Sequence, residues 1–199
     1  MKKNSTQKNY GIYLLFSIVL GLFTGWVTSD LLAYGIGEEL LKGLGLWIFF
    51  LALLGAFSHN AARGGLHGGL FILATTAGFY ENNVLAERSM VLPHIVFLGV
   101  SVLIGGIISF VSWHYHEKDW LGAICVAVPV SLMLGESYSI YTGSGLTFSF
   151  LADLAGALLL LILLAPGSRK KLMALPVIIV FTFGLVYFNV FARFFGGWI

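Results

Sequence analysis

The side chains in this sequence best suited to chemistry are carboxyl groups set in or beside apolar stretches. Asp153 lies inside the run Phe-Leu-Ala-Asp-Leu-Ala-Gly-Ala, Glu136 ends an apolar run just upstream, and Glu81 ends an earlier one. A carboxylate at membrane depth costs roughly 2.5 to 3.5 kcal/mol on insertion scales, so it normally faces a partner or water rather than lipid. These acids therefore predict a polar site that the rest of the protein shields from lipid.

Tyrosines accompany the acids in the sequence. Tyr80 precedes Glu81, and Tyr138 and Tyr141 follow Glu136. Carboxylates combined with tyrosine rings suit a cationic ligand, through charge pairing and cation–π contact. A carboxyl group removed from water is also suited to relaying protons near neutral pH. The same residues therefore predict either a solute or cation site or a proton relay.

Two groups near the end of the chain could balance the acidic charges. Asn189 and Arg193 are four residues apart, which places them on one face of a helix. Arg193 could therefore form a structural ion pair with Asp153 or Glu136. Three interpretations of the acidic residues stay open at this point: a structural ion pair, a site for a solute or cation, and a proton relay.

Histidines make up a second group with possible chemistry, near the ends of three apolar segments. They are His59, His67, His114 and His116. Imidazole binds zinc, copper, nickel and iron, so three or four converging rings would make a metal site. The spacing does not favour this, because residues two apart on a helix point to different sides. Histidines beside tryptophan and tyrosine are also typical of membrane surfaces, which is the alternative interpretation.

The elements that must position these residues are long and apolar. Hydrophobic residues make up 58% of the chain and charged residues 10%, and the mean hydropathy is +0.93. A soluble domain carries about a quarter charged residues. Seven segments approach the roughly 20 residues needed to cross a hydrocarbon core about 30 Å thick. They are residues 11–28, 40–57, 64–80, 92–113, 120–136, 147–165 and 172–192.

Backbone groups in hydrocarbon must be paired within the protein, so these crossings are expected to be α-helices. The predicted fold is an all-α, polytopic integral membrane helix bundle with about seven transmembrane helices. The connections between the segments are short, so residues 1–199 are expected to form a single transmembrane domain with no soluble domain. Short connections also favour a bacterial cytoplasmic membrane as the location.

The distribution of lysine and arginine predicts the orientation. With the N-terminus in the cytoplasm and the C-terminus outside, eight basic residues fall inside and three outside, as the positive-inside rule requires. The inner set is Lys2, Lys3, Lys8, Arg63, Lys118, Arg169, Lys170 and Lys171, and the outer set is Lys42, Arg88 and Arg193. This topology places the three acids on the outer side and the four histidines on the cytoplasmic side.

Pairs of small residues spaced four apart predict close packing between helices. Gly21 and Gly25 form one such pair, and overlapping pairs fill the segment from Gly64 to Gly69. Lipid tails are as apolar as leucine, so membrane helices associate where small residues let their backbones approach. These faces are expected to pack within the chain, or to contact a partner membrane subunit or another copy of the protein.

Function is predicted at the level of class. The main hypothesis is a membrane protein that binds or transports a small solute, cationic or neutral, or an ion through the outer-side acidic and aromatic site. The alternative is a non-catalytic accessory or resistance protein that contacts a partner through its helix faces. A third hypothesis is a metalloenzyme built on the histidines. No catalytic residue and no cofactor is predicted. No nucleic-acid partner is predicted either, because no basic stripe interleaved with aromatic residues is present.

Overall fold

The chain folds into α-helices in a computed structural model. The structure describes the backbone of residues 3–33, 44–84 and 92–191, and the side chains of residues 11–28, 44–79 and 99–191. Within these ranges there are seven α-helices, one short 3₁₀-helix and no β-strand. The prediction of an all-α fold is confirmed for the part of the chain that is described.

The helices coincide with the seven apolar segments expected from the sequence. They are α1 (Lys3–Ala33), α3 (Gly45–Ala56), α4 (Ala61–Val84), α5 (Leu92–Trp113), the 3₁₀-helix η1 (His114–His116), α6 (Trp120–Ser144), α7 (Phe148–Leu164) and α8 (Ser168–Tyr187). The fifth segment was predicted to end at Glu136, which is wrong. Helix α6 continues to Ser144 and stops where Gly145 adopts a φ of 79°, a conformation that glycine accepts readily. Glu136 therefore lies within a helix.

The helices differ in length. Three of them are long and apolar enough to cross a membrane, through Gly11–Thr28, Trp120–Ser144 and Ser168–Tyr187. Helix α7 has 17 residues and α3 only 12. At 1.5 Å per residue α3 is about 18 Å long, well short of a hydrocarbon core of about 30 Å. The described part of the predicted crossing at 40–57 is thus helical over little more than half the thickness of the hydrocarbon core.

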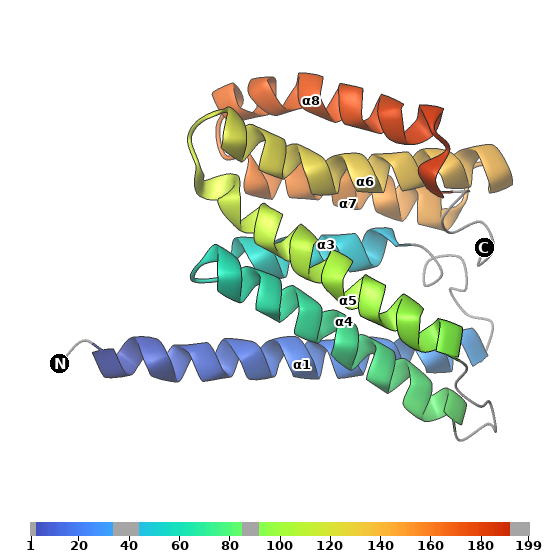
Figure 1. Cartoon of the computed structure of the whole chain (residues 1–199). Helices are drawn as coiled ribbons and strands as arrows, with labels where there is room; N and C mark the ends of the chain where they lie inside the picture. The colour runs from blue at the N-terminus through green and yellow to red at the C-terminus, as the bar shows by residue number, and fades with distance from the viewer. Residues whose placement is uncertain (1–2, 34–43, 85–91, 192–199) are drawn as a thin grey trace.

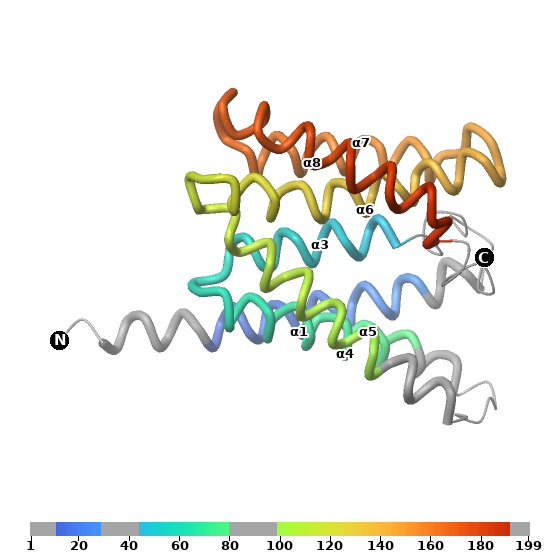
Figure 2. The backbone as a smooth tube through the Cα atoms, turned by 45° about the horizontal axis from the view of Figure 1, so that its top comes forward, coloured from blue at the N-terminus to red at the C-terminus, as the bar shows by residue number. Residues whose placement is uncertain are grey.

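The helices form two groups with α3 between them (Figures 1 and 2). Helices α1, α4 and α5 pack on one another and make up the N-terminal group, while α7 and α8 pack on α6 and make up the C-terminal group. Helix α3 contacts α4 and α5 on one side and α6 and α7 on the other. Contacts between the two groups therefore run largely through α3.

Successive helices run in alternate directions (Figure 1). The connections at residues 57–60, 114–119 and 165–167 lie at the end where α1 begins, and the connection at residues 145–147 lies at the opposite end. Arg63, Lys118 and the basic residues at 169–171 therefore gather at one end of the bundle. We call this the basic end. The opposite end, where α6 ends and α7 begins, is called the acidic end.

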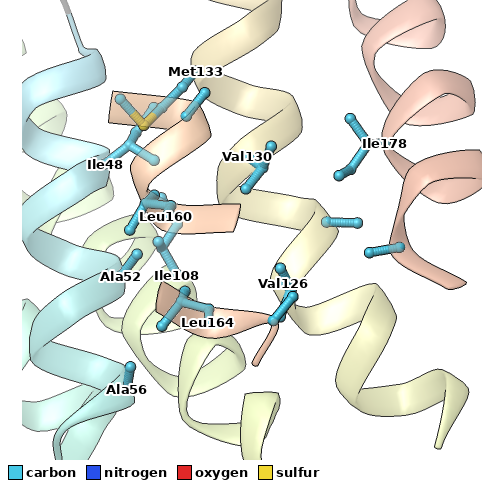
Figure 3. Close-up of a cluster of buried hydrophobic side chains, with 14 of the residues drawn as sticks. Ile48, Ala52, Ala56, Ile108, Val126, Val130, Met133, Leu160, Leu164 and Ile178 are labelled. Atoms are coloured by element: carbon cyan, nitrogen blue, oxygen red, sulfur yellow. The ribbon is translucent and has the colours of Figure 1, made fainter. Parts of the chain in front are cut away.

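The apolar core joins α3 to the C-terminal group. Ile48 and Ala52 of α3 face the C-terminal group, where Val130 of α6 and Leu160 of α7 belong to the same core (Figure 3). Outward faces are just as apolar: Ile12 is 66% exposed and Ile179 is also 66% exposed. A helix that is apolar on all sides is at home in the core of a large protein or in a membrane. The exposed apolar faces thus agree with the membrane character expected from the sequence.

Glycines bring backbones into direct contact, as the small-residue pattern predicted. A Cβ atom at Gly25 would collide with the carbonyl oxygen of Thr75, and one at Gly21 would press on the carbonyl oxygen of Phe71. On the facing helix, a Cβ atom at Gly78 would collide with the carbonyl oxygen of Leu22. Helices α1 and α4 are therefore in contact backbone to backbone, and there is no room for a side chain between them.

Replacing Gly25 with alanine should destabilise the protein by about 1–3 kcal/mol, because the new methyl group meets a backbone carbonyl that has no room to move. Gly11, on the same helix, is the matched control, since a Cβ atom there would meet nothing within 4 Å. Thermal unfolding in detergent should show a lower midpoint for Gly25→Ala and an unchanged or slightly higher one for Gly11→Ala. Equal midpoints for the two variants would contradict the packing described for α1 and α4.

Candidate functional site

Glu136 and Asp153 are buried in the bundle. Glu136 is 3% exposed and Asp153 is 4% exposed, although both belong to apolar helices, α6 and α7. Neither carboxyl group therefore points toward the surroundings of the protein. Both carboxyl groups reach the start of α3, at the neighbouring residues Leu44 and Gly45. We refer to Glu136 and Asp153 as the carboxyl pair.

The carboxyl pair lies at the N-terminus of α3. Oε1 of Glu136 accepts a hydrogen bond from the backbone N–H of Leu44, the residue just before α3. The carboxyl group of Asp153 lies against Gly45 so closely that a Cβ atom there would collide with it. Two acids from the C-terminal group therefore meet at two consecutive residues where α3 begins.

This arrangement follows from the shortness of α3. The first N–H groups of any helix have no partner within the helix and need one from elsewhere. Leu44, the residue that precedes α3, has no side chain that could cap it. In an apolar bundle an unpaired N–H group is costly, so Glu136 supplies the missing acceptor. The partial positive charge of the helix N-terminus in turn favours a carboxylate at this position.

Part of the pair remains without a partner. Oε2 of Glu136 and Oδ2 of Asp153 have no hydrogen-bond partner within the described residues, and neither does the hydroxyl of Ser149. Ser149 is 2% exposed and stands four residues before Asp153, on the same face of α7. An isolated buried carboxylate is very costly, so it binds a proton, a cation or a hydrogen-bond donor. The site therefore has the composition to take a positively charged ligand.

The tyrosines and Asn189 differ from the pair in exposure. Tyr138 is 48% exposed and Tyr141 is 49% exposed, with the ring of Tyr141 5.5 Å from that of Phe150. Asn189 is exposed beyond the end of α8 and has a φ of 49°. These three side chains are exposed and are not buried with the pair, so their place beside the site stays a prediction.

Three further residues of the expected site fall where the structure gives no side-chain positions. Tyr80 and Glu81 belong to the last part of α4, whose side chains are outside the described residues. Arg193 lies outside the described residues altogether. The ion pair of Arg193 with Asp153 or Glu136 therefore stays a prediction.

The histidines lie at the basic end, and no group of three or more histidine, cysteine or acidic residues that could hold a metal occurs in the described part of the chain. His67 is buried, with Nδ1 3.3 Å from the hydroxyl of Ser58. Nε2 of His116 is 3.3 Å from the carbonyl oxygen of Ala56. His59 is exposed, and the ring of His114 lies 5.0 Å from that of Trp113. The four rings are thus distributed among separate contacts.

Other hydrogen bonds near the histidines involve the C-terminal part of α3. The indole N–H of Trp113 donates to the carbonyl oxygen of Ser58 at 3.0 Å, and the hydroxyl of Ser58 donates to that of Leu54 at 2.6 Å. Ser109 of α5 donates to the carbonyl oxygen of Leu51 at 2.7 Å. Polar side chains of α5 therefore bond to carbonyls along and just beyond the C-terminal half of α3.

Sequence reasoning missed Leu44, Gly45 and Ser149 as members of the site. A serine four residues before a buried aspartate on a helix was available as a signal for Ser149. Nothing local marks Leu44 and Gly45, whose contribution is backbone. Their place in the site follows from the start of α3 at Gly45, which lies inside the apolar segment at 40–57.

Replacing Glu136 with alanine should lower the free energy of unfolding by about 1–3 kcal/mol, because the N–H of Leu44 loses its acceptor in an apolar interior. Glu136→Gln should lower it less, since the amide oxygen still accepts. Tyr138→Phe, on an exposed side chain of the same helix, is the control and should leave stability unchanged. Thermal or denaturant unfolding in detergent measures all three. A glutamine variant as unstable as the alanine variant would mean that the charge matters more than the hydrogen bond.

Comparison with protein-family models, with curated proteins and with solved structures gives no match. Function is therefore inferred from the placement of residues in the chain itself. The described residues offer a buried carboxyl pair at the start of a short central helix, with two unpaired carboxyl oxygens and an unpaired hydroxyl beside it.

Proposed function

We propose that this protein is a membrane bundle of seven crossings, with the N-terminus in the cytoplasm, that binds or moves a small solute or ion at the carboxyl pair. Glu136 and Asp153 are the binding groups in this proposal. The helix ends that carry Tyr138, Tyr141 and Asn189 form the outer approach, and Glu81, Tyr80 and Arg193 are further candidates for it. The membrane is a cytoplasmic one.

The topology is supported by two independent features. Three helices have the length and hydropathy of membrane spans, and successive helices run in alternate directions (Figure 1). The basic residues Arg63, Lys118 and those at 169–171 gather at the end where α1 begins, which agrees with a cytoplasmic location for that end. The carboxyl pair then belongs to the outer half of the bundle.

The observation that carries the proposed function is the burial of two acids with unpaired oxygens. Exposures of 3% and 4% are unusual for glutamate and aspartate, which are almost never fully buried unless paired. Ionisable residues within membrane segments generally mark ion or substrate pathways. Capping α3 accounts for Oε1 of Glu136 but leaves Oε2 of Glu136 and Oδ2 of Asp153 unexplained. A positively charged ligand accounts for them.

The location of the pair also suits transport. Both acids belong to the C-terminal group, and their contact is with α3, which packs on the N-terminal group as well. A ligand that changes the charge of the pair would act at the surface where the two groups meet. In transporters, movement of one helix group against another exposes a central site to each side in turn.

A second candidate is an accessory protein that contacts a partner helix. An apolar groove runs along the outer surface between α4 and α5, lined by Gly65, Gly69, Gly106 and apolar side chains that include Leu66 and Leu103. Glycine-lined faces are typical of helix association in membranes. In this case the polar residues of the bundle would hold it together and bind no ligand.

The topology can be tested with single cysteines, because Cys125 is buried and is the one cysteine of the chain. In a Cys125→Ala background, Ser144→Cys should react with a membrane-impermeant maleimide added to intact cells. Lys118→Cys should react only after the membrane is opened. Both positions are exposed, so access to the reagent decides the result. Labelling of Lys118→Cys in intact cells would contradict the orientation.

The binding function can be tested by thermal unfolding of purified protein with cationic metabolites, neutral metabolites and inorganic cations. A ligand present at 100 times its Kd should stabilise the wild type by about 2.7 kcal/mol. Asp153→Asn should abolish this shift while the protein still expresses and folds. Asp119→Asn is the matched control, because Asp119 is exposed and its side chain makes no capping bond.

The accessory role predicts a different outcome for the same variants. Asp153→Asn would then lower the unfolding temperature by the same amount with every added compound and with none. No compound would shift the wild type, and purification from mild detergent would bring a second membrane subunit with it.

A further inference from the structure

We propose that the carboxyl pair holds one proton, on Oδ2 of Asp153, which donates it to Oε2 of Glu136, and that the hydroxyl of Ser149 passes this proton toward the acidic end. This inference rests on the proposed function and identifies the ion. The protein is in this account a proton-binding one, and any solute that it moves is coupled to proton binding.

The division of roles within the pair follows from the contacts of each acid. Glu136 accepts the backbone N–H of Leu44 at the start of α3, where the helix dipole stabilises negative charge. Oδ2 of Asp153 has no described donor, and its carboxyl group lies against Gly45. Two carboxylates that share a buried site cannot both remain ionised at little cost. The proton therefore belongs on Asp153, and Glu136 keeps the charge that α3 requires.

A shared proton also resolves the two unpaired atoms at once. Oε2 of Glu136 and Oδ2 of Asp153 are both acceptors without a described donor. One proton turns Oδ2 of Asp153 into a donor and gives Oε2 of Glu136 the hydrogen bond that it lacks. Such a bond from a neutral acid to a carboxylate is a charge-assisted one and among the strongest in proteins.

A metal cation fits the same place less well. The N-terminus of α3 carries partial positive charge, which opposes a cation and favours the carboxylate. Hard cations such as magnesium and calcium take six or more oxygen ligands. The unpaired oxygen atoms found together in the described part are those of Glu136, Asp153 and the hydroxyl of Ser149. Three oxygens are too few to replace the water shell of such an ion.

Ser149 is placed to connect the pair with the outer approach. It stands one helical turn before Asp153 on α7, at the second residue of that helix, and it is 2% exposed. Its hydroxyl is unpaired within the described residues and can accept a proton and donate one in the same step. A proton taken up from water beyond α7 reaches Asp153 through this group, and the hydroxyl is restored when it donates its own proton.

Few other titratable groups face the pair. Helix α3 carries none, and α7 carries none besides Asp153. On α6 the nearest are the half-exposed Tyr138 and Tyr141, and on α8 Tyr187 is 72% exposed. Glu38, Glu39, Lys42 and Arg193 belong to segments outside the described residues, and Glu81 to the part of α4 without described side chains. A lysine or arginine from these segments is the rival to the proton.

Infrared spectroscopy of purified protein at neutral pH distinguishes a carboxylic acid from a carboxylate. The wild type should show the C=O stretching band of one buried carboxylic acid, and Asp153→Asn should lose it. Glu136→Gln should keep the band but move its frequency, because the acceptor changes from a carboxylate to an amide. This second variant reports on the pair even if Asp153→Asn does not fold.

The role of Ser149 is read from the same band. After transfer into deuterated water the band shifts as the proton is exchanged, and Ser149→Ala should slow this shift several-fold while the band itself remains. Ser144→Ala, at the exposed end of α6, is the control and should exchange at the wild-type rate. Equal rates for Ser149→Ala and the wild type would remove Ser149 from the proposal.

Three results would overturn the assignment of a proton. The first is the absence of a carboxylic acid band in the wild type, which would mean that a basic residue pairs with the acids. The second is a band that survives Asp153→Asn, or that does not move in Glu136→Gln. The third is loss of the band when sodium or potassium is added at constant pH. In that last case a metal cation is the ligand and the proposed function stands.

The proposed function can fail separately. A carboxylic acid band with the expected response to the variants, in a protein that no solute or cation stabilises and that moves no protons across a vesicle membrane, would support the proton assignment alone. The pair would then be a protonated structural contact at the start of α3.

Discussion

The structure depends on how the two ends of α3 satisfy their backbone hydrogen bonds away from water. Helix α3 begins inside the apolar bundle, so its first N–H groups must find partners there, while the backbone of Phe57 and Ser58 bonds to two of its last carbonyls. Glu136 of the C-terminal group serves the first end. Trp113 and Ser109 of the N-terminal group bond to carbonyls near the second. These polar contacts tie α3 to both helix groups.

This constraint explains why Glu136 is buried at the start of α3. Glu136 is required at the start of α3 for structural reasons, and its burial places a negative charge where a second acid is costly. Asp153 occupies that position nonetheless, against a glycine that leaves it room. A structural role alone does not call for the second acid. Its presence is the feature that a ligand or a proton explains.

Most of the helices and the burial of Asp153 were predictable from the sequence, because both depend on local apolar runs. Helix α5 has the predicted bounds, 92–113. The end of α6 was not predictable, since the polar residues after Glu136 resemble a loop and yet continue the helix until Gly145. The buried acids of the site were predictable for the same reason, whereas its backbone members, Leu44 and Gly45, were not. Apolar context identifies buried acids, but it cannot indicate which backbone groups they contact. Tyr138 and Tyr141 are close to Glu136 in sequence, yet they are half-exposed whereas Glu136 is buried.

The backbone contact between α1 and α4 has a mechanical consequence. Where Gly21 and Gly25 touch the carbonyls of the facing helix, no flexible side chain is present to absorb a sliding movement. Helices α1 and α4 are therefore joined as a stiff plate. Gly55 of α3 packs on the carbonyl oxygen of Ser109 just as closely, so α3 belongs to the same tightly packed unit. The carboxyl pair of α6 and α7 meets this unit at Leu44 and Gly45.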